Sequence, residues 1–179
     1  MNNKSFYFVL AAFLGFLFIA ATNYSPSTDG SPAGVCGAPN DDKDCSSCHK
    51  GKPKAMDGLI TSNIDNNAYE PGKKYTITLN VKGNAKSKKF GFQTSPQNAK
   101  GKVMGKLIVT NPTETKTAGN GKYMNQIKGG VDGNVSKTWT FDWVAPAKGS
   151  GDITFYGSFL IGGKPETMYN STLALKEAK

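Results

Sequence analysis

Arginine is missing from the chain, and all 22 basic residues are lysines. Arginine is the side chain that binds phosphate groups and guanine bases with two parallel hydrogen bonds. The lysines are scattered along the sequence and form no single basic run. We therefore expect no nucleic-acid partner, despite a formal net charge of +9. The lysines either form a solvated surface or steer the protein toward an acidic partner, such as a redox protein.

Histidine is almost as scarce, since His49 is the only one in the chain. General acid–base catalysis most often uses histidine, and a serine nucleophile usually needs one as its base. His49 belongs to the motif described next, so no catalytic group of side chains remains. We expect that the protein is not an enzyme.

Cysteine occurs three times, and two of the three belong to the sequence CSSCH at residues 45–49. In an exported protein this spacing is typical of c-type haem attachment. Two thiols three positions apart in a tight turn can each add to one vinyl group of the same porphyrin, and the next residue places its imidazole on the iron. We expect one covalently attached haem c, with thioether bonds to Cys45 and Cys48 and with His49 as the proximal iron ligand.

Three other interpretations of these residues stay open. A disulfide between Cys45 and Cys48 suits an oxidising compartment. A zinc site using Cys36, Cys45, Cys48 and His49 is a second option, although two adjacent residues are an awkward pair for one tetrahedral centre. A thioredoxin-like redox pair normally opens a helix in a βαβ unit, and no such pattern follows here. Cys36 is then an exposed thiol, an intermolecular partner or a small apolar residue buried near the haem.

The other face of the iron has no second histidine available to it. Methionine is the next usual ligand, and the candidates are Met56, Met104, Met124 and Met168. Met124 ranks first, because it follows Tyr123 in the polar, glycine-flanked segment GNGKYMNQIKGG. A lysine ligand and an open, five-coordinate iron are the alternatives, and an open iron would indicate binding of small molecules.

Long apolar runs are absent after the first 22 residues. Residues 1–22 combine Lys4 with an uncharged apolar stretch over residues 6–21, which is the form of a secretory signal peptide. The stretch is shorter than the roughly 20 residues of a membrane span, and a retained N-terminal anchor is the alternative. We expect an exported protein of the periplasm, the outer-membrane surface or the extracellular space. Residues 23–40 predict a flexible linker, and residues 41–58 form the haem-attachment segment.

Residues 59–179 show no sustained helical period. Alternation is clearest in residues 73–82, where Tyr75, Ile77, Leu79 and Val81 share one face. Similar runs follow the turn signals elsewhere, at residues 59–64, 90–92, 103–109, 138–143, 153–161 and 169–175. About seven such strands predict an all-β protein, an antiparallel Ig-like β-sandwich preceded by the loop that carries the haem motif.

These pieces, in this order, resemble a bacterial group of exported proteins seen especially in Bacteroidetes. The group has a Reeler-like (reelin N-terminal-like) β-sandwich with a CxxCH prefix and is often named choice-of-anchor V. The matching pieces span residues 37–175 and read GAPNDDKDCSSCHKG, YEPGKKYTITLNV, FGFQ, WTFDWVAP and GDITFYGS. The resemblance implies a Reeler-like sandwich over residues 59–179. Members tend to have a histidine, a candidate distal haem ligand, shortly after the tyrosine that matches Tyr123. Gln126 occupies about that position here, so Met124 is expected in its place.

Together these features predict an exported monohaem protein, similar to a c-type cytochrome, for electron transfer or for redox or ligand sensing at the cell envelope. Its partner would be a redox protein or an envelope complex, and it would touch the membrane only through an uncleaved N-terminal segment. The alternative is a secreted β-sandwich module for binding or adhesion. In that case Cys45 and Cys48 form a disulfide or a non-functional haem site.

Overall fold

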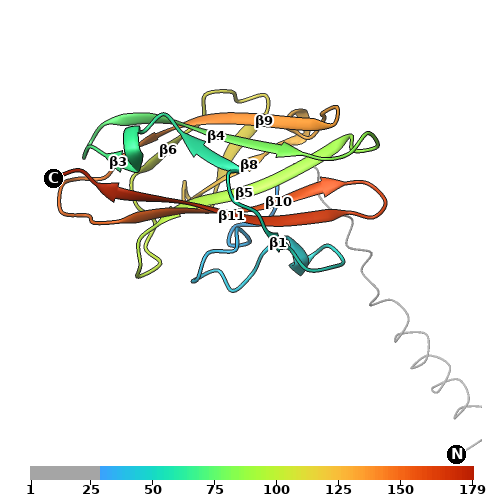
Figure 1. Ribbon diagram of the computed structural model, residues 1–179, viewed down its shortest axis with the longest axis horizontal. Coiled ribbons are helices and arrows are strands. Elements are labelled where there is room, and N and C mark those ends of the chain that lie inside the picture. The colour runs from blue at the N-terminus through green and yellow to red at the C-terminus, as the bar shows by residue number, and fades with distance from the viewer. Residues whose placement is uncertain (1–28) are drawn as a thin grey trace, which may run out of the picture.

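The computed structural model describes residues 29–179, which form two β-sheets packed face to face (Figure 1). One sheet has seven strands. Six of them follow the order β1 (Lys54–Ala55), β11 (Thr167–Glu177), β10 (Ile153–Gly162), β5 (Lys89–Gln97), β8 (Tyr123–Gln126) and β7 (Thr115–Ala118), and β3 (Ala68–Tyr69) also pairs with β11. The other sheet has the order β2 (Ile60–Ser62), β4 (Lys74–Lys82), β9 (Ser136–Val144) and β6 (Lys106–Ile108).

Most strand pairs are antiparallel. Among the described strands, only the two-residue strands β1 and β3 pair in parallel, both with β11. Three short 3₁₀ turns complete the elements: η1 (Cys45–Ser47), η2 (Asp65–Asn67) and η3 (Lys128–Gly130). None of the helical turns within residues 29–179 is long and apolar enough to cross a membrane. The expected all-β antiparallel sandwich is confirmed.

The pairing of β4 with β9 shows how alternating residues build the core. Ile77 lies opposite Phe141 and Leu79 lies opposite Trp139, and all four side chains are buried between the sheets. Phe92 of β5 meets them from the other sheet, with its ring centroid 4.7 Å from that of Trp139. Large aromatic side chains contribute much of the apolar area that such a core buries.

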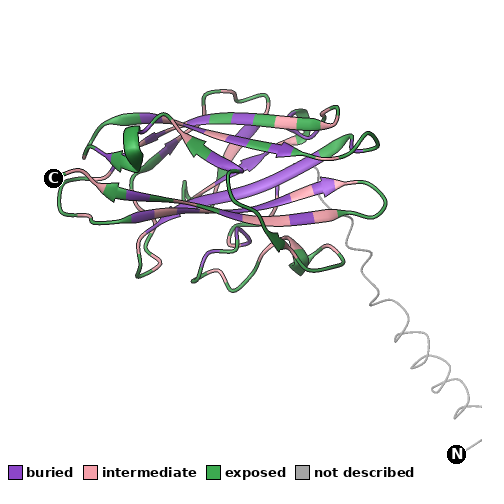
Figure 2. Cartoon of the chain, in the orientation of Figure 1, coloured by how far each residue is buried: buried purple, intermediate pink, exposed green. Residues whose placement is uncertain are grey.

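Strand β5 is buried on both of its faces (Figure 2). Phe90 and Phe92 belong to the core, whereas Gly91 and Gln93 face away from it. An antiparallel sheet commonly leaves its outer face to solvent. Here residues 29–47 lie over that outer face, below the seven-stranded sheet in the view of Figure 1.

The predicted flexible linker, residues 23–40, differs in its described part. Gly30, Val35, Cys36 and Ala38 are buried, and the Val35 N–H donates to Gln93 Oε1 at 2.7 Å. Hydrogen bonds to Gln93 of β5 hold this segment in place. Residues 29–40 form no helix or strand, so their sequence shows no apolar periodicity. Residues 29–40 are therefore part of the folded body. The predicted signal peptide, residues 1–22, lies outside the described residues.

Candidate functional site

The CSSCH motif folds as a tight turn. Asp44 caps η1, since its Oδ1 accepts hydrogen bonds from Ser46 N at 2.8 Å and Ser46 Oγ at 2.6 Å. The backbone N–H groups of Cys48 and His49 both donate to Cys45 O, at 3.3 and 3.0 Å. The turn keeps the two cysteines and the histidine within one short stretch of backbone.

Two hydrogen bonds fix this turn on the outer face of the seven-stranded sheet. The Cys45 N–H donates to Ser158 Oγ of β10 at 3.1 Å. Asn170 Nδ2 of β11 donates to Asp44 Oδ2 at 3.1 Å. The motif is therefore positioned by two neighbouring strands of the larger sheet.

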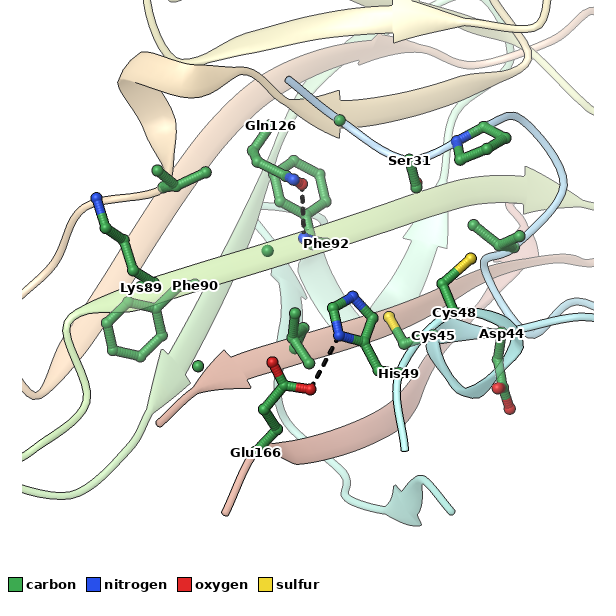
Figure 3. Close-up of a pocket in the computed structure, with 17 residues that line it drawn as sticks. Ser31, Asp44, Cys45, Cys48, His49, Lys89, Phe90, Phe92, Gln126 and Glu166 are labelled. Carbon is green, nitrogen blue, oxygen red and sulfur yellow. Dashed lines mark hydrogen bonds and ion pairs between the residues drawn. The ribbon is translucent and has the colours of Figure 1, made fainter. Parts of the chain in front are cut away.

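A pocket of about 240 Å³ lies between the turn and the sheet, and Cys45, Cys48 and His49 all line it (Figure 3). Gly91 of β5 and Gly162 of β10 lie on the strand side, where the lack of a side chain leaves space above the backbone. Val35, Val131 and Leu160 are apolar lining residues outside the core cluster, and Phe90 and Phe92 also line the pocket although their rings pack in the core. The structure thus brings all three predicted haem-attachment residues to one pocket.

His49 is oriented by Glu166, which lies in the connection between β10 and β11. His49 Nδ1 is 2.9 Å from Glu166 Oε2, and the His49 side chain is only 15% exposed. An ionised carboxylate can only accept a hydrogen bond, so Nδ1 carries the proton. Nε2 is then left as the ring nitrogen for a metal, and Figure 3 shows it directed into the pocket.

The two motif cysteines differ in exposure. Cys48 is exposed and Cys45 is half-buried, and neither is in a disulfide. Burial raises the pKa of the Cys45 thiol to about 11. Within residues 29–179 no group of three or more His, Cys, Asp or Glu side chains is arranged to hold a metal ion. The four residues weighed as a zinc site are therefore not gathered as one.

Cys36 lies apart from the pocket. Its side chain is fully buried, and Sγ donates to Asp41 Oδ2 at 2.9 Å. Asp41 Oδ1 also accepts a hydrogen bond from Tyr123 Oη at 2.7 Å. Burial, followed by the hydrogen bond and the charge of Asp41, raises the pKa of the Cys36 thiol well above its usual range. Of the alternatives left open for Cys36, the exposed thiol is wrong, and the side chain is buried and hydrogen-bonded but does not line the pocket.

Met124, predicted as the distal ligand, does not line the pocket. It is fully buried in the core cluster between the sheets. The reason is register: Met124 of β8 lies opposite Thr94 of β5, in the part of β8 that is paired into the sheet. The other methionine candidates, Met56, Met104 and Met168, do not line the pocket either.

Gln126, two residues further along β8, does line the pocket. Gln126 is only 6% exposed, and its Oε1 accepts a hydrogen bond from the Phe92 N–H at 2.8 Å. Sequence reasoning missed Gln126 and Glu166 as pocket residues. The available signals were the place of Gln126 near the histidine of similar proteins, and the glycines inside the strand sequences FGFQ and LIGG.

The Reeler domain family matches residues 46–162 of the chain. The fold is similar to the crystal structure of the Reelin-N domain of F-spondin, with 17% identity, a TM-score of 0.55 and coverage of 73% of this chain and 94% of that one. A human F-spondin reeler domain gives 17% identity and a TM-score of 0.55, covering 72% of this chain and 95% of that one. No protein with a curated description matches the chain.

The family match covers the sandwich from the second residue of the CSSCH motif through β10. Residues 29–45, which include Cys45 and one wall of the pocket, precede it. The match covers more than half of the chain and includes all of the CSSCH motif except Cys45, so the chain belongs to the Reeler domain family.

Proposed function

We propose that this protein is exported and carries one haem c, bound through Cys45 and Cys48, with His49 as the proximal iron ligand. The observation that supports this is the shared pocket. Both cysteines and the histidine line it, and Glu166 holds Nδ1 so that Nε2 is directed inward. A histidine that ligates a metal commonly donates its other N–H to a carboxylate in this way.

Attachment needs no oxidant, because each thiol adds across a vinyl group. The sulfur bonds to the inner vinyl carbon, the thiol proton goes to the outer carbon, and the double bond becomes a single bond. The exposed Cys48 and the half-buried Cys45 both lie at the pocket wall where such an addition would take place.

The size and lining of the pocket fit part of a porphyrin. Its volume of about 240 Å³ is below the roughly 300–1,000 Å³ of pockets that enclose most of a ligand. One edge of the ring would remain outside, and Gly91 and Gly162 place no side chain on the strand side of the pocket. When bound, the iron supplies one-electron redox chemistry, and an exposed edge suits electron transfer to a redox protein or an envelope complex. The residues of the chain contribute attachment, orientation and an apolar wall.

Export is part of the same proposal and rests on residues 1–22. The protein would work in the periplasm, at the outer-membrane surface or outside the cell, since the CxxCH spacing predicts haem attachment in exported proteins.

The alternative is a secreted β-sandwich module for binding or adhesion. Membership of the Reeler family is compatible with this alternative. The family match covers residues 46–162 and does not include Cys45, so it does not require a haem. A fold by itself does not select an activity. In this alternative Cys45 and Cys48 form a disulfide or a non-functional haem site.

The deciding experiment is co-expression of the full chain with a cytochrome c maturation system, followed by a pyridine haemochrome spectrum of the denatured protein. We expect a c-type α band that is lost in the double variant Cys45→Ala, Cys48→Ala and kept in Cys36→Ser. A folded, haem-free protein with a Cys45–Cys48 disulfide would instead establish the alternative.

A further inference from the structure

The side-chain amide of Gln126 lies across the pocket from His49, on the side where a second iron ligand would bind. We propose that the iron is open on this side and that Gln126 Nε2 donates a hydrogen bond to a small diatomic molecule bound there. The inference rests on the haem function proposed above. It identifies the class of ligand that this site would sense.

The strand order places Gln126 across the pocket from His49. Gln126 comes from β8, and the turn that carries His49 is fixed on β10 through Ser158. Strand β5 lies between β8 and β10 and contributes Gly91 to the pocket. Figure 3 shows His49 and Gln126 on opposite sides of β5.

The orientation of the Gln126 amide is determined by its contact with β5. The Phe92 N–H can only donate, so the amide atom that faces it at 2.8 Å must be Oε1. This leaves Nε2 on the other side, over Gly91: a Cβ added there would lie 3.3 Å from Nε2. Any side chain at position 91 would therefore fill the space beside the amide.

Nε2 has protons to donate and nothing among residues 29–179 that accepts them, although Gln126 is only 6% exposed. An amide held by its oxygen with its N–H₂ group directed into a pocket is a ready hydrogen-bond donor. A diatomic molecule bound end-on to iron presents a terminal atom with lone pairs, which is the acceptor that this geometry lacks.

No side chain that lines the pocket is an obvious sixth ligand. None of the lining residues is a methionine, and the chain has no second histidine. Lys89 lines the pocket, but its Nζ is paired with Asp132 Oδ1. To bind iron, Lys89 would have to leave this carboxylate and lose a proton.

The test uses the haem-loaded full chain and four variants, of which Lys89→Gln serves only to test whether Lys89 binds the iron. Gln126→Leu removes the donor, and Gln126→Glu removes it while keeping an oxygen for the Phe92 N–H, which protects the fold. Met124→Leu is the matched control, because Met124 is the neighbouring candidate on β8 but lies in the core. The probes are carbon monoxide for the ferrous form and cyanide for the ferric form.

We expect the ferrous wild type to bind carbon monoxide without first releasing a protein ligand. In Gln126→Leu and Gln126→Glu the C–O stretching frequency should rise. The cyanide dissociation constant should increase about tenfold in Gln126→Leu, which corresponds to about 1.4 kcal/mol. Met124→Leu should match the wild type in both measurements.

Haem loading is measured first, so the two proposals fail separately. A wild type without covalent haem refutes the proposed function. A loaded wild type that is six-coordinate, and becomes five-coordinate in Met124→Leu, Lys89→Gln or Gln126→Leu, overturns only the open site and identifies the ligand. Unchanged C–O frequency and cyanide affinity in both Gln126 variants also overturn the inference.

Discussion

The contact between His49 and Glu166 determines which imidazole nitrogen faces the pocket. The two groups meet at 2.9 Å, although 117 positions separate them in the sequence. Because the carboxylate accepts a hydrogen bond from Nδ1–H, it also increases electron density on the ring, and in the proposed haem protein a more basic imidazole would stabilise the oxidised iron. Glu166 is therefore a positioning residue with an electronic effect.

Glu166→Gln is the substitution that separates these two roles, since glutamine keeps an oxygen for the Nδ1–H but removes the charge. We expect the midpoint potential of the haem-loaded protein to rise by tens of millivolts, where about 60 mV corresponds to a tenfold change for a one-electron couple. Potentiometric titration measures this. Glu70→Gln is the control, because Glu70 pairs with Lys73 on the exposed surface. Equal potentials in wild type and Glu166→Gln would rule out the electronic role.

The buried thiol of Cys36 predicts a loss of stability in alkaline solution. Its pKa is raised in the folded protein, first by burial and then by Asp41, whereas in the unfolded chain it titrates near 8.5. Between these values only the unfolded state releases the proton. The contribution to stability is therefore complete below pH 8.5 and declines as the pH rises, by about 1.4 kcal/mol per pH unit for one proton.

Cys36→Ser tests this, because serine can keep the hydrogen bond to Asp41 but does not titrate in this range. Chemical denaturation between pH 7 and 10.5 should give a shallower alkaline decline for Cys36→Ser than for the wild type. Tyrosines and lysines titrate in both proteins, so the difference between the two curves isolates Cys36. Parallel curves would show that the thiol ionises as readily in the folded protein as in the unfolded chain.

At the scale of elements, Gln93 of β5 holds the segment that precedes the CSSCH motif. Its Oε1 accepts a hydrogen bond from the Val35 N–H, and its Nε2 lies within 2.9 Å of three oxygens, Ser31 Oγ, Pro32 O and Asn125 Oδ1. The segment also approaches β8 closely at Gly30, where an added Cβ would lie 2.9 Å from Gln126 O. Residues 30–35 thereby form one wall of the pocket.

Gln93→Ala should destabilise the protein more than Gln97→Ala, by about 1–3 kcal/mol, because it leaves buried donors and acceptors unpaired. Both glutamines are 1% exposed on the same strand, so the two truncations remove similar buried volume. Gln97 makes one long hydrogen bond of 3.4 Å, and its Oε1 has no partner. Thermal denaturation measures the difference, and hydrogen exchange should show residues 30–36 losing protection only in Gln93→Ala. Equal stabilities would assign the segment to other contacts.

Strands with one buried face could be predicted from the sequence, and the others could not. Alternation found β4, β9 and β10, since each packs one face on the core. It found only residues 90–92 of β5, because this strand is buried on both faces and its outer side carries glycine and glutamine. Strand β8 was missed, since its buried residues Asn125 and Gln126 are polar and hydrogen-bonded.

The same limit applies to the pocket. The spacing of Cys45, Cys48 and His49 identified the motif because all three lie within one turn. Glu166 and Gln126 reach the pocket only through the order β10–β5–β8, which no local pattern contains. The polar segment around Met124 favours it as a ligand, but strand register turns its side chain into the core.

At the scale of the whole molecule, two parts of the chain build the pocket. The Reeler family matches residues 46–162 and supplies most of the seven-stranded sheet, and residues 29–49, of which only 46–49 lie within the match, lie on its outer face and carry Cys45, Cys48 and His49. A face that is normally solvated thereby becomes the back wall of a pocket. The chemistry proposed here also needs Cys45 and Glu166, which line the pocket but lie outside the match, so the family match by itself does not imply it.

The charge of the whole molecule predicts which redox reagents would reach the edge of the proposed haem fastest. The 22 lysines exceed the 13 acidic residues and give the chain a net charge of +9, so at low salt the protein attracts anions.

Anionic ferricyanide should oxidise the ferrous haem-loaded protein faster at low ionic strength. Its rate should fall on the order of tenfold as salt shortens the Debye length from about 30 Å at 0.01 M to about 8 Å at 0.15 M. A cationic ruthenium hexaammine oxidant should show the opposite trend, and stopped-flow absorbance measures both. If both rates were independent of salt, the lysines would be a solvated surface without a role in steering, and the partner would have to be recognised through local contacts at the pocket edge.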